Sequence, residues 1–133
     1  MKRRAALILV LSAAWFSACD RPNTPVDAAW GKQPCSECGM TVSEPRHSAQ
    51  LITAGGDRRF FDDIGCMVKH LESQAPDAKL VWVRDGDRWV PANEARFQAG
   101  AKTPMNYGFA TSSSGTLDFS AVKKAVLEKK REH

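Results

Sequence analysis

The sequence lacks the residue groups on which most enzyme sites are built. It has no nucleophile set beside a general base and an oxyanion hole, no glycine-rich phosphate loop and no hydrolase signature. Only one Cys-x-x-Cys pair is present, Cys35 and Cys38, so a zinc knuckle made from two such pairs is excluded. These absences indicate that the protein is not an enzyme.

Positive charge is also scarcer than the formal net charge of +4 suggests. Lys2, Arg3 and Arg4 precede an apolar stretch from Ala5 to Phe16. Removal of residues 1–18 takes away these three basic residues and no acidic one, so the net charge falls to about +1. The remaining charges are interspersed, which argues against a nucleic-acid-binding surface.

The N-terminus has the pattern of a bacterial lipoprotein signal. The apolar stretch is too short to cross a bilayer of about 30 Å comfortably as a helix, but its length and basic flank are typical of a signal peptide. It ends in Ser17-Ala18-Cys19, which resembles the lipobox whose cysteine is lipidated and becomes the new N-terminus. Asp20, just after Cys19, favours retention at the inner membrane.

The chain therefore divides into three predicted parts. We predict a signal peptide over residues 1–18, a flexible tether over residues 19–33 and one globular, monomeric domain over residues 34–133. The export signal places the domain in the periplasm, anchored to a membrane by lipid on Cys19. That compartment is oxidising, and with Cys19 lipidated an odd number of three cysteines remains.

The domain has mixed α and β patterning. Its first half predicts β-β-α-β, with a helix over 64–73 that Asp62 or Asp63 caps. In its second half we predict a final helix capped by Asp118. The predicted strands cover 48–53, 58–61, 80–83, 88–91 and 106–111, with a helical turn over 93–98.

The run Cys35-Ser36-Glu37-Cys38-Gly39-Met40 carries the chemistry. A thioredoxin-like redox pair would open a helix, but Gly39-Met40 favours a turn and extended chain. A structural zinc site lacks a full ligand set, with only Cys66 and His70 as further candidates, and gains nothing from methionine. An inert disulfide with Met40 as core filler, and a Cu(I) site that uses thiolate and thioether ligands, are the other two alternatives.

The chain resembles the NosL family, lipoproteins regarded as copper chaperones for nitrous oxide reductase. The resemblance covers about the whole mature globule. Its motifs are Cys19, the run from Cys35 to Met40, the segments 48–52 and 61–67, and Thr103-Pro104-Met105-Asn106-Tyr107-Gly108-Phe109-Ala110.

The resemblance implies an α+β fold of two small ββαβ-like halves packed into one compact unit. It also implies one Cu(I) held by Cys38 and Met40, with Met105 as the distant ligand and Cys35 as the less certain thiol. The expected partner is a client copper enzyme, nitrous oxide reductase or its maturation complex, which would receive copper by ligand exchange.

Three further side chains are weaker metal candidates. Cys66 and His70 lie four residues apart on the predicted helix, on a face outside its core stripe, where they would form a half-buried thiol beside a surface histidine. His47 follows Pro45-Arg46 on a loop and would most simply be solvated. Two other functions stay open: a periplasmic thiol-disulfide oxidoreductase that uses Cys35 and Cys38, and a structural lipoprotein with an inert disulfide.

Overall fold

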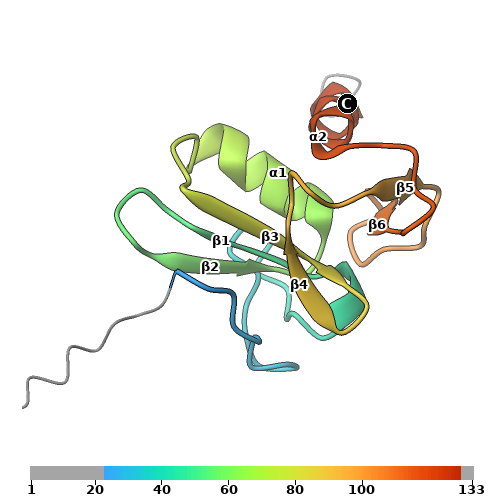
Figure 1. Cartoon of the computed structure of the whole chain (residues 1–133). Helices are drawn as coiled ribbons and strands as arrows, with labels where there is room; N and C mark the ends of the chain where they lie inside the picture. The colour runs from blue at the N-terminus through green and yellow to red at the C-terminus, as the bar shows by residue number, and fades with distance from the viewer. Residues whose placement is uncertain (1–22, 130–133) are drawn as a thin grey trace, which may run out of the picture.

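A four-stranded antiparallel sheet forms the centre of the structure, a computed structural model that describes residues 23–129. Its strands are β1 (Ala49–Ile52), β2 (Arg58–Phe61), β3 (Leu80–Asp85) and β4 (Arg88–Pro91), in the order β2-β1-β3-β4 (Figure 1). Two α-helices and a second, two-stranded sheet complete it, which confirms the predicted α+β class. The predicted signal peptide, the lipidation of Cys19 and residues 130–133 lie outside the described residues.

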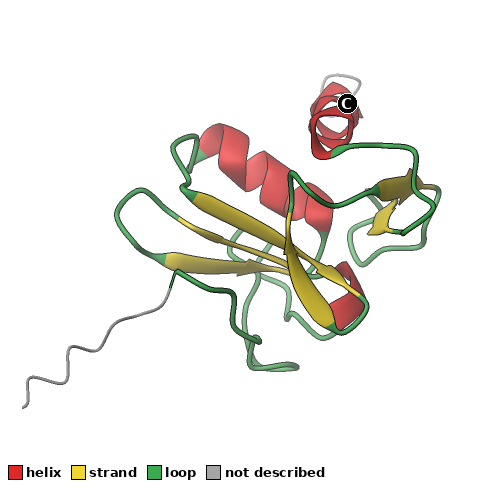
Figure 2. Cartoon of the chain, in the orientation of Figure 1, coloured by secondary structure: helices red, strands yellow, loops and turns green. Residues whose placement is uncertain are grey.

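Alternating side chains divide the four-stranded sheet into an inner and an outer face. Ala49 lies beside Phe61 on one neighbouring strand and Val83 on the other, so all three point to the inner face. Helix α1 (Ile64–Ser73) covers this face (Figure 2). The core between sheet and helix contains Leu51, Phe61, Ile64, Met67, Val68 and Val83.

Helix α1 has the predicted bounds and begins at the predicted pair of aspartates. Asp63 is the cap: its Oδ1 accepts a hydrogen bond from the backbone N–H of Gly65 at 2.9 Å. Such a bond satisfies one of the N–H groups that a helix leaves unpaired at its start. Asp63 Oδ2 accepts a second bond, from the N–H of Met105, also at 2.9 Å. One carboxylate thus fixes both the start of α1 and the turn that carries Met105.

Residues 23–33, which belong to the predicted tether, lie on the outer face of the sheet. The buried side chain of Gln50 accepts a bond from the N–H of Val26 (3.2 Å) and donates to its carbonyl (2.8 Å). Arg84 forms an ion pair with Asp27 and lies 5.8 Å from the centre of the Trp30 ring. The structure therefore differs from the prediction of a flexible tether up to Gln33, because buried polar side chains of the sheet find their partners in this segment.

The second half differs more from its predicted elements. Strands β5 (Phe97–Ala99) and β6 (Phe109–Thr111) form the two-stranded sheet, so the predicted helical turn over 93–98 runs into a strand. The strand predicted over 106–111 begins only at Phe109. Its first residue, Asn106, has a left-handed φ of 59° and ends a turn closed by its N–H to the carbonyl of Thr103.

The final helix forms as predicted. Helix α2 (Phe119–Lys129) begins after Asp118, whose Oδ1 accepts a hydrogen bond from the N–H of Ala121 at 2.8 Å. Its buried Val122 and Val126 pack it beside α1. The second predicted ββαβ half is incomplete among the described residues: β5, β6 and α2 are present, but no strand follows α2. Strand β4 pairs with β3 and so belongs to the first sheet.

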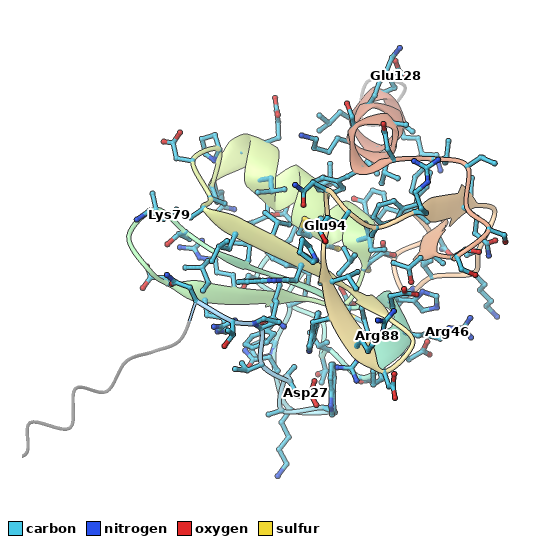
Figure 3. The ribbon with its side chains drawn as sticks, in the orientation of Figure 1. Asp27, Arg46, Lys79, Arg88, Glu94 and Glu128 are labelled. Atoms are coloured by element: carbon cyan, nitrogen blue, oxygen red, sulfur yellow. The ribbon has the colours of Figure 1, made fainter. Side chains whose placement is uncertain are left out.

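Few large hydrophobic side chains are exposed within residues 23–129. They are Val26, Met40 and Met105. Most charged side chains lie on the outside, with Asp62, Asp63 and Arg84 as buried exceptions; Figure 3 shows Asp27, Lys79 and Glu128 on different sides of the molecule. None of the helices in this part of the chain combines the length and apolar character needed to cross a membrane.

Candidate metal centre

Three cysteine thiols and one carboxylate converge at one point in the structure. The sulfurs of Cys35, Cys38 and Cys66 and a carboxylate oxygen of Asp62 all lie within 4.8 Å of one another. All three cysteines are free thiols. Metal–sulfur bonds are about 2.3 Å long, so one ion placed among these atoms can approach all of them. We refer to these four residues as the thiol cluster, which can hold a metal ion.

The donor atoms of the thiol cluster suit thiophilic ions. Thiolates are the soft ligands that Cu(I) prefers. Asp62 adds an oxygen, so the four side chains also offer the number of ligands that tetrahedral Zn(II) takes. From the sequence, a zinc site lacked a full set of ligands. In the structure, Cys66 and Asp62 lie beside Cys35 and Cys38 and complete a set of four.

Cys35 and Cys38 lie in a tight turn between two chain segments that form an isolated bridge, Pro34 to Thr41. The N–H of Cys35 donates to the carbonyl of Met40 at 2.7 Å, and the N–H of Gly39 donates to the carbonyl of Cys35 at 3.0 Å. Gly39 has a φ of 76°, which a residue with a side chain rarely adopts. The prediction that no helix follows the pair is confirmed: the chain from residue 23 to helix η1 (Pro45–His47) is loop (Figure 2).

Cys66 reaches the thiol cluster from the first turn of α1. Its predicted place outside the core stripe is wrong, because the side chain is only 1% exposed. The reason is that the turn containing Cys35 covers the face of α1 that the sheet leaves open, and the thiol of Cys66 donates a hydrogen bond to Cys35. The hydrophobic pattern of a single helix cannot show such a second covering segment.

Asp62 is the member of the thiol cluster that the sequence did not reveal. We expected Asp62 and Asp63 to serve as a helix cap and a partner of the helix dipole, but the cap needs only Asp63. Asp62 is buried instead, and its Oδ1 accepts a hydrogen bond from Cys38 Sγ at 3.5 Å. One feature of the sequence could have indicated this role: Asp62 is a second carboxylate next to the capping residue, and it lies four positions before Cys66.

The thiol cluster is electrostatically asymmetric. Donation from the Cys66 thiol, together with the backbone N–H groups of Cys38, Asp62 and Glu37, lowers the pKa of Cys35 to about 6, although burial opposes this shift. Burial, followed by a hydrogen bond to Cys35 and then by the negative charge of its thiolate, raises the pKa of Cys38 to about 11, although the N–H of Met40 opposes this shift. Donation to Cys35 and burial raise the pKa of Cys66. Cys35 therefore loses its proton first and is held as a thiolate between two thiols.

This asymmetry predicts the titration of the metal-free, reduced protein. Ultraviolet thiolate absorbance should show one thiol ionising near pH 6, and this step should vanish in Cys35→Ser and move to higher pH in Cys66→Ala, which removes the donor. Because the folded pKa lies below the ordinary value of 9.0, the stabilisation from Cys35 is present above pH 9 and is lost as the pH falls toward about 6. An identical titration in Cys35→Ser would contradict the assignment.

The two predicted methionine ligands lie on segments next to the thiol cluster. Met40 is two residues after Cys38, and its backbone N–H donates to the Cys38 sulfur. Met105 is fixed by Asp63 at the start of the helix that carries Cys66. The two residues are 59% and 38% exposed, so both lie at the surface of the protein. The alternative of an inert disulfide requires these methionines to be buried in the core, and neither of them is.

Neither candidate histidine belongs to the thiol cluster. The predicted surface position of His70 is wrong: it is 1% exposed, 5.2 Å from the ring of Phe61, and bonded to Glu37 and Arg59. The expectation of a solvated His47 is wrong as well. This side chain is 4% exposed because η1 packs against β3, and its Nδ1 has no hydrogen-bond partner among the described residues.

No family model, no curated protein and no solved structure matches this chain. Its function must therefore be inferred from the thiol cluster and the surrounding residues.

Proposed function

We propose that this protein binds Cu(I) at the thiol cluster and passes it to a client copper enzyme. The observation that supports this proposal is the convergence of three free thiols within 4.8 Å, with exposed Met40 on the Cys35–Cys38 turn and exposed Met105 on the turn that Asp63 fixes to the start of α1. Cu(I) is stabilised by both thiolate and thioether sulfur, whereas Zn(II) gains little from methionine. Exposed Met40 and Met105 therefore favour Cu(I) over Zn(II).

The unequal burial of the sulfurs supports transfer by ligand exchange. Cys35 and Cys66 are 3% and 1% exposed, Cys38 is half-buried, and Met40 is 59% exposed. An incoming thiolate or thioether of the client would replace the outer ligands first, while the buried thiols still hold the ion. Copper would thus pass between proteins without becoming free, because Cu(I) tolerates low coordination numbers.

The resemblance to the NosL family extends the proposal to the cellular location of the protein and to the enzyme that receives the copper. The protein would be periplasmic, held at a bacterial membrane by lipid on Cys19, and would serve nitrous oxide reductase or its maturation complex. Thr24 is already bound to the sheet, where its carbonyl accepts a hydrogen bond from Arg58 at 2.7 Å. Five residue steps from Cys19 span at most about 18 Å, so the anchor would keep the domain close to the membrane.

Titration of the reduced protein with Cu(I) against a competing chelator tests the proposal. We expect one Cu(I) per chain and a loss of about tenfold or more in affinity for Cys38→Ser, with smaller losses for Met40→Leu and Met105→Leu. The matched control is Met67→Leu, because Met67 is fully buried in the core and carries no proposed ligand. Unchanged affinity in all three ligand variants would exclude Cu(I) binding at this place.

A thiol-disulfide oxidoreductase is the second candidate, because the pKa of Cys35 is lowered to about 6. An attacking cysteine of such an enzyme must be both ionised and accessible. In this chain the two properties are separated: Cys35 is 3% exposed, whereas the more exposed Cys38 has a pKa raised to about 11. This arrangement fits a metal site better than a redox pair.

A further inference from the structure

A buried polar network lies beside the thiol cluster. His70 Nδ1 is 3.1 Å from Glu37 Oε2, and His70 Nε2 is 2.8 Å from Arg59 Nη1. The imidazole is 1% exposed and the side chain of Glu37 is 16% exposed, so water has little access to these bonds. The network therefore consists of a carboxylate, an imidazole and a guanidinium in series.

The partners of His70 determine which of its nitrogens carries a proton. A guanidinium has no acceptor, so Arg59 must donate to Nε2, which is then unprotonated. A carboxylate accepts hydrogen bonds, so Nδ1 carries the proton and donates it to Glu37. His70 is thus a neutral bridge between one negative and one positive side chain. The network adds no net charge beside the thiol cluster.

Each residue of the network comes from one of the three segments that build the thiol cluster. Glu37 lies between Cys35 and Cys38 in the tight turn. His70 is one helical turn after Cys66 on α1, and Arg59 is on β2, the strand that ends immediately before Asp62. The network therefore ties together the same turn, helix and strand whose side chains must meet around a metal ion.

The turn has few other contacts that would hold it against α1. Its internal backbone bonds fix its shape, and the N–H of Ser36 donates to the carbonyl of Phe60 on β2. These bonds leave the spacing between the turn and α1 to side chains: Cys35, which lies beside the Cys66 thiol, and Glu37, which is bonded to His70 one helical turn further along. Ordering ligands before the metal arrives removes part of the entropy cost of binding.

We propose that Glu37, His70 and Arg59 are positioning residues that hold the Cys35–Cys38 turn against α1, so that the three thiols converge before a metal ion binds. The inference rests on the proposed function only for the identity of the metal. Convergence of the thiols is a property of the metal-free chain and can be measured without copper.

Phenylarsine oxide is the probe for convergence in the reduced full chain; for this probe every protein, including the otherwise unmodified one, carries Cys38→Ser, so that the arsenic must bridge Cys35 on the turn and Cys66 on α1. Its arsenic stays trivalent while it bonds two thiol sulfurs, and its oxygen leaves as water with the two thiol protons. We expect Glu37→Ala to weaken arsenical binding several-fold and Cu(I) binding about tenfold, at the low end of the ~10–100-fold cost of losing an outer partner of a metal site. His70→Ala should behave in the same way.

The conservative variant separates positioning from charge. Glu37→Gln removes the negative charge but keeps an oxygen that accepts the proton of His70 Nδ1, so it should stay within about twofold of the unmodified chain for both probes. Glu72→Ala is the matched control, since it removes an exposed carboxylate from the same helix as His70. A folded Glu37→Ala protein is expected even if His70→Ala fails to fold, because Glu37 is only partly buried.

The outcomes distinguish this inference from the proposed function. If Glu37→Ala binds phenylarsine oxide as tightly as Glu37→Gln does, the positioning role is wrong, whatever happens with copper. If the unmodified chain fails to bind Cu(I) but arsenical binding depends on Glu37, the copper proposal falls and the positioning role stands.

Discussion

Cys66→Ser is expected to lower the Cu(I) affinity of the reduced protein by about a hundredfold or more, exceeding the usual ~10–100-fold cost of losing an outer partner. The structure places this thiol within 4.8 Å of Cys35 and Cys38, on the rigid first turn of α1. Serine keeps the size and the hydrogen-bonding ability of the side chain but replaces a soft donor with a hard one, which Cu(I) disfavours. Competition with a chromophoric Cu(I) chelator measures the change.

The control for this experiment is Val68→Ala. Val68 lies two residues further along α1 and is as fully buried as Cys66, but its side chain carries no donor atom. Truncating it should reduce the free energy of unfolding, by about 1 kcal/mol or more, and leave Cu(I) affinity almost unchanged. A Cys66→Ser protein that retains full affinity would show that copper is held without Cys66, by the ligands that the sequence resemblance implied: Cys38 and the methionines, with Cys35 as the less certain thiol.

Gly65→Ala should reduce the free energy of unfolding by about 2 kcal/mol, although alanine is the better helix former. The added Cβ would overlap the ring of Tyr107, which packs directly on the first turn of α1. Without that side chain, its Cβ included, the same substitution would gain about 0.5–1 kcal/mol from helix propensity. The sign of the effect is therefore decided by a residue 42 positions away in the sequence. Chemical denaturation measures the free energy of unfolding of the variant and of the unmodified protein.

The double variant tests this explanation. In a Tyr107→Gly background, Gly65→Ala should be neutral or stabilising, because both the ring and the Cβ of Tyr107, which the added methyl group would overlap, are gone. Equal destabilisation in both backgrounds would contradict the close approach of Tyr107. The same contact holds the turn with Met105 near Asp63 and Cys66, so Gly65→Ala in the unmodified background should also alter the exposure of Met105 to oxidation.

Several elements were predictable because their signals are local. The helix at Ile64–Ser73 follows from a capping aspartate and an apolar periodicity, and the strands of the first sheet follow from their β-branched and aromatic residues. Predictions failed where a distant segment decides the outcome. Phe97 forms a strand because Thr111 and Leu117 pair with it, and residues 23–33 are ordered because Gln50, Arg58 and Arg84 bind them.

In the candidate site, too, local features were predictable from the sequence and contacts between distant segments were not. The sequence identified the pair Cys35 and Cys38, the glycine that turns the chain after them, and Met40 as a neighbouring sulfur. It predicted a half-buried Cys66 and an exposed His70, since a helical wheel distinguishes only one buried face. In the structure α1 is covered by the sheet on one side and by the Cys35–Met40 turn on another, so both side chains are buried.

Cys35, Cys38 and Met40 could be recognised as soft candidate ligands before any folding was considered, because ligand softness and the spacing of Cys-x-x-Cys are properties of the residues and of the short chain between them. That Cys66 and Asp62 complete the cluster, and that Glu37, His70 and Arg59 lie beside it, is known from the fold alone. These residues meet because hairpin, helix and turn pack around one core. Such packing depends on the whole set of side chains and on no single stretch of sequence.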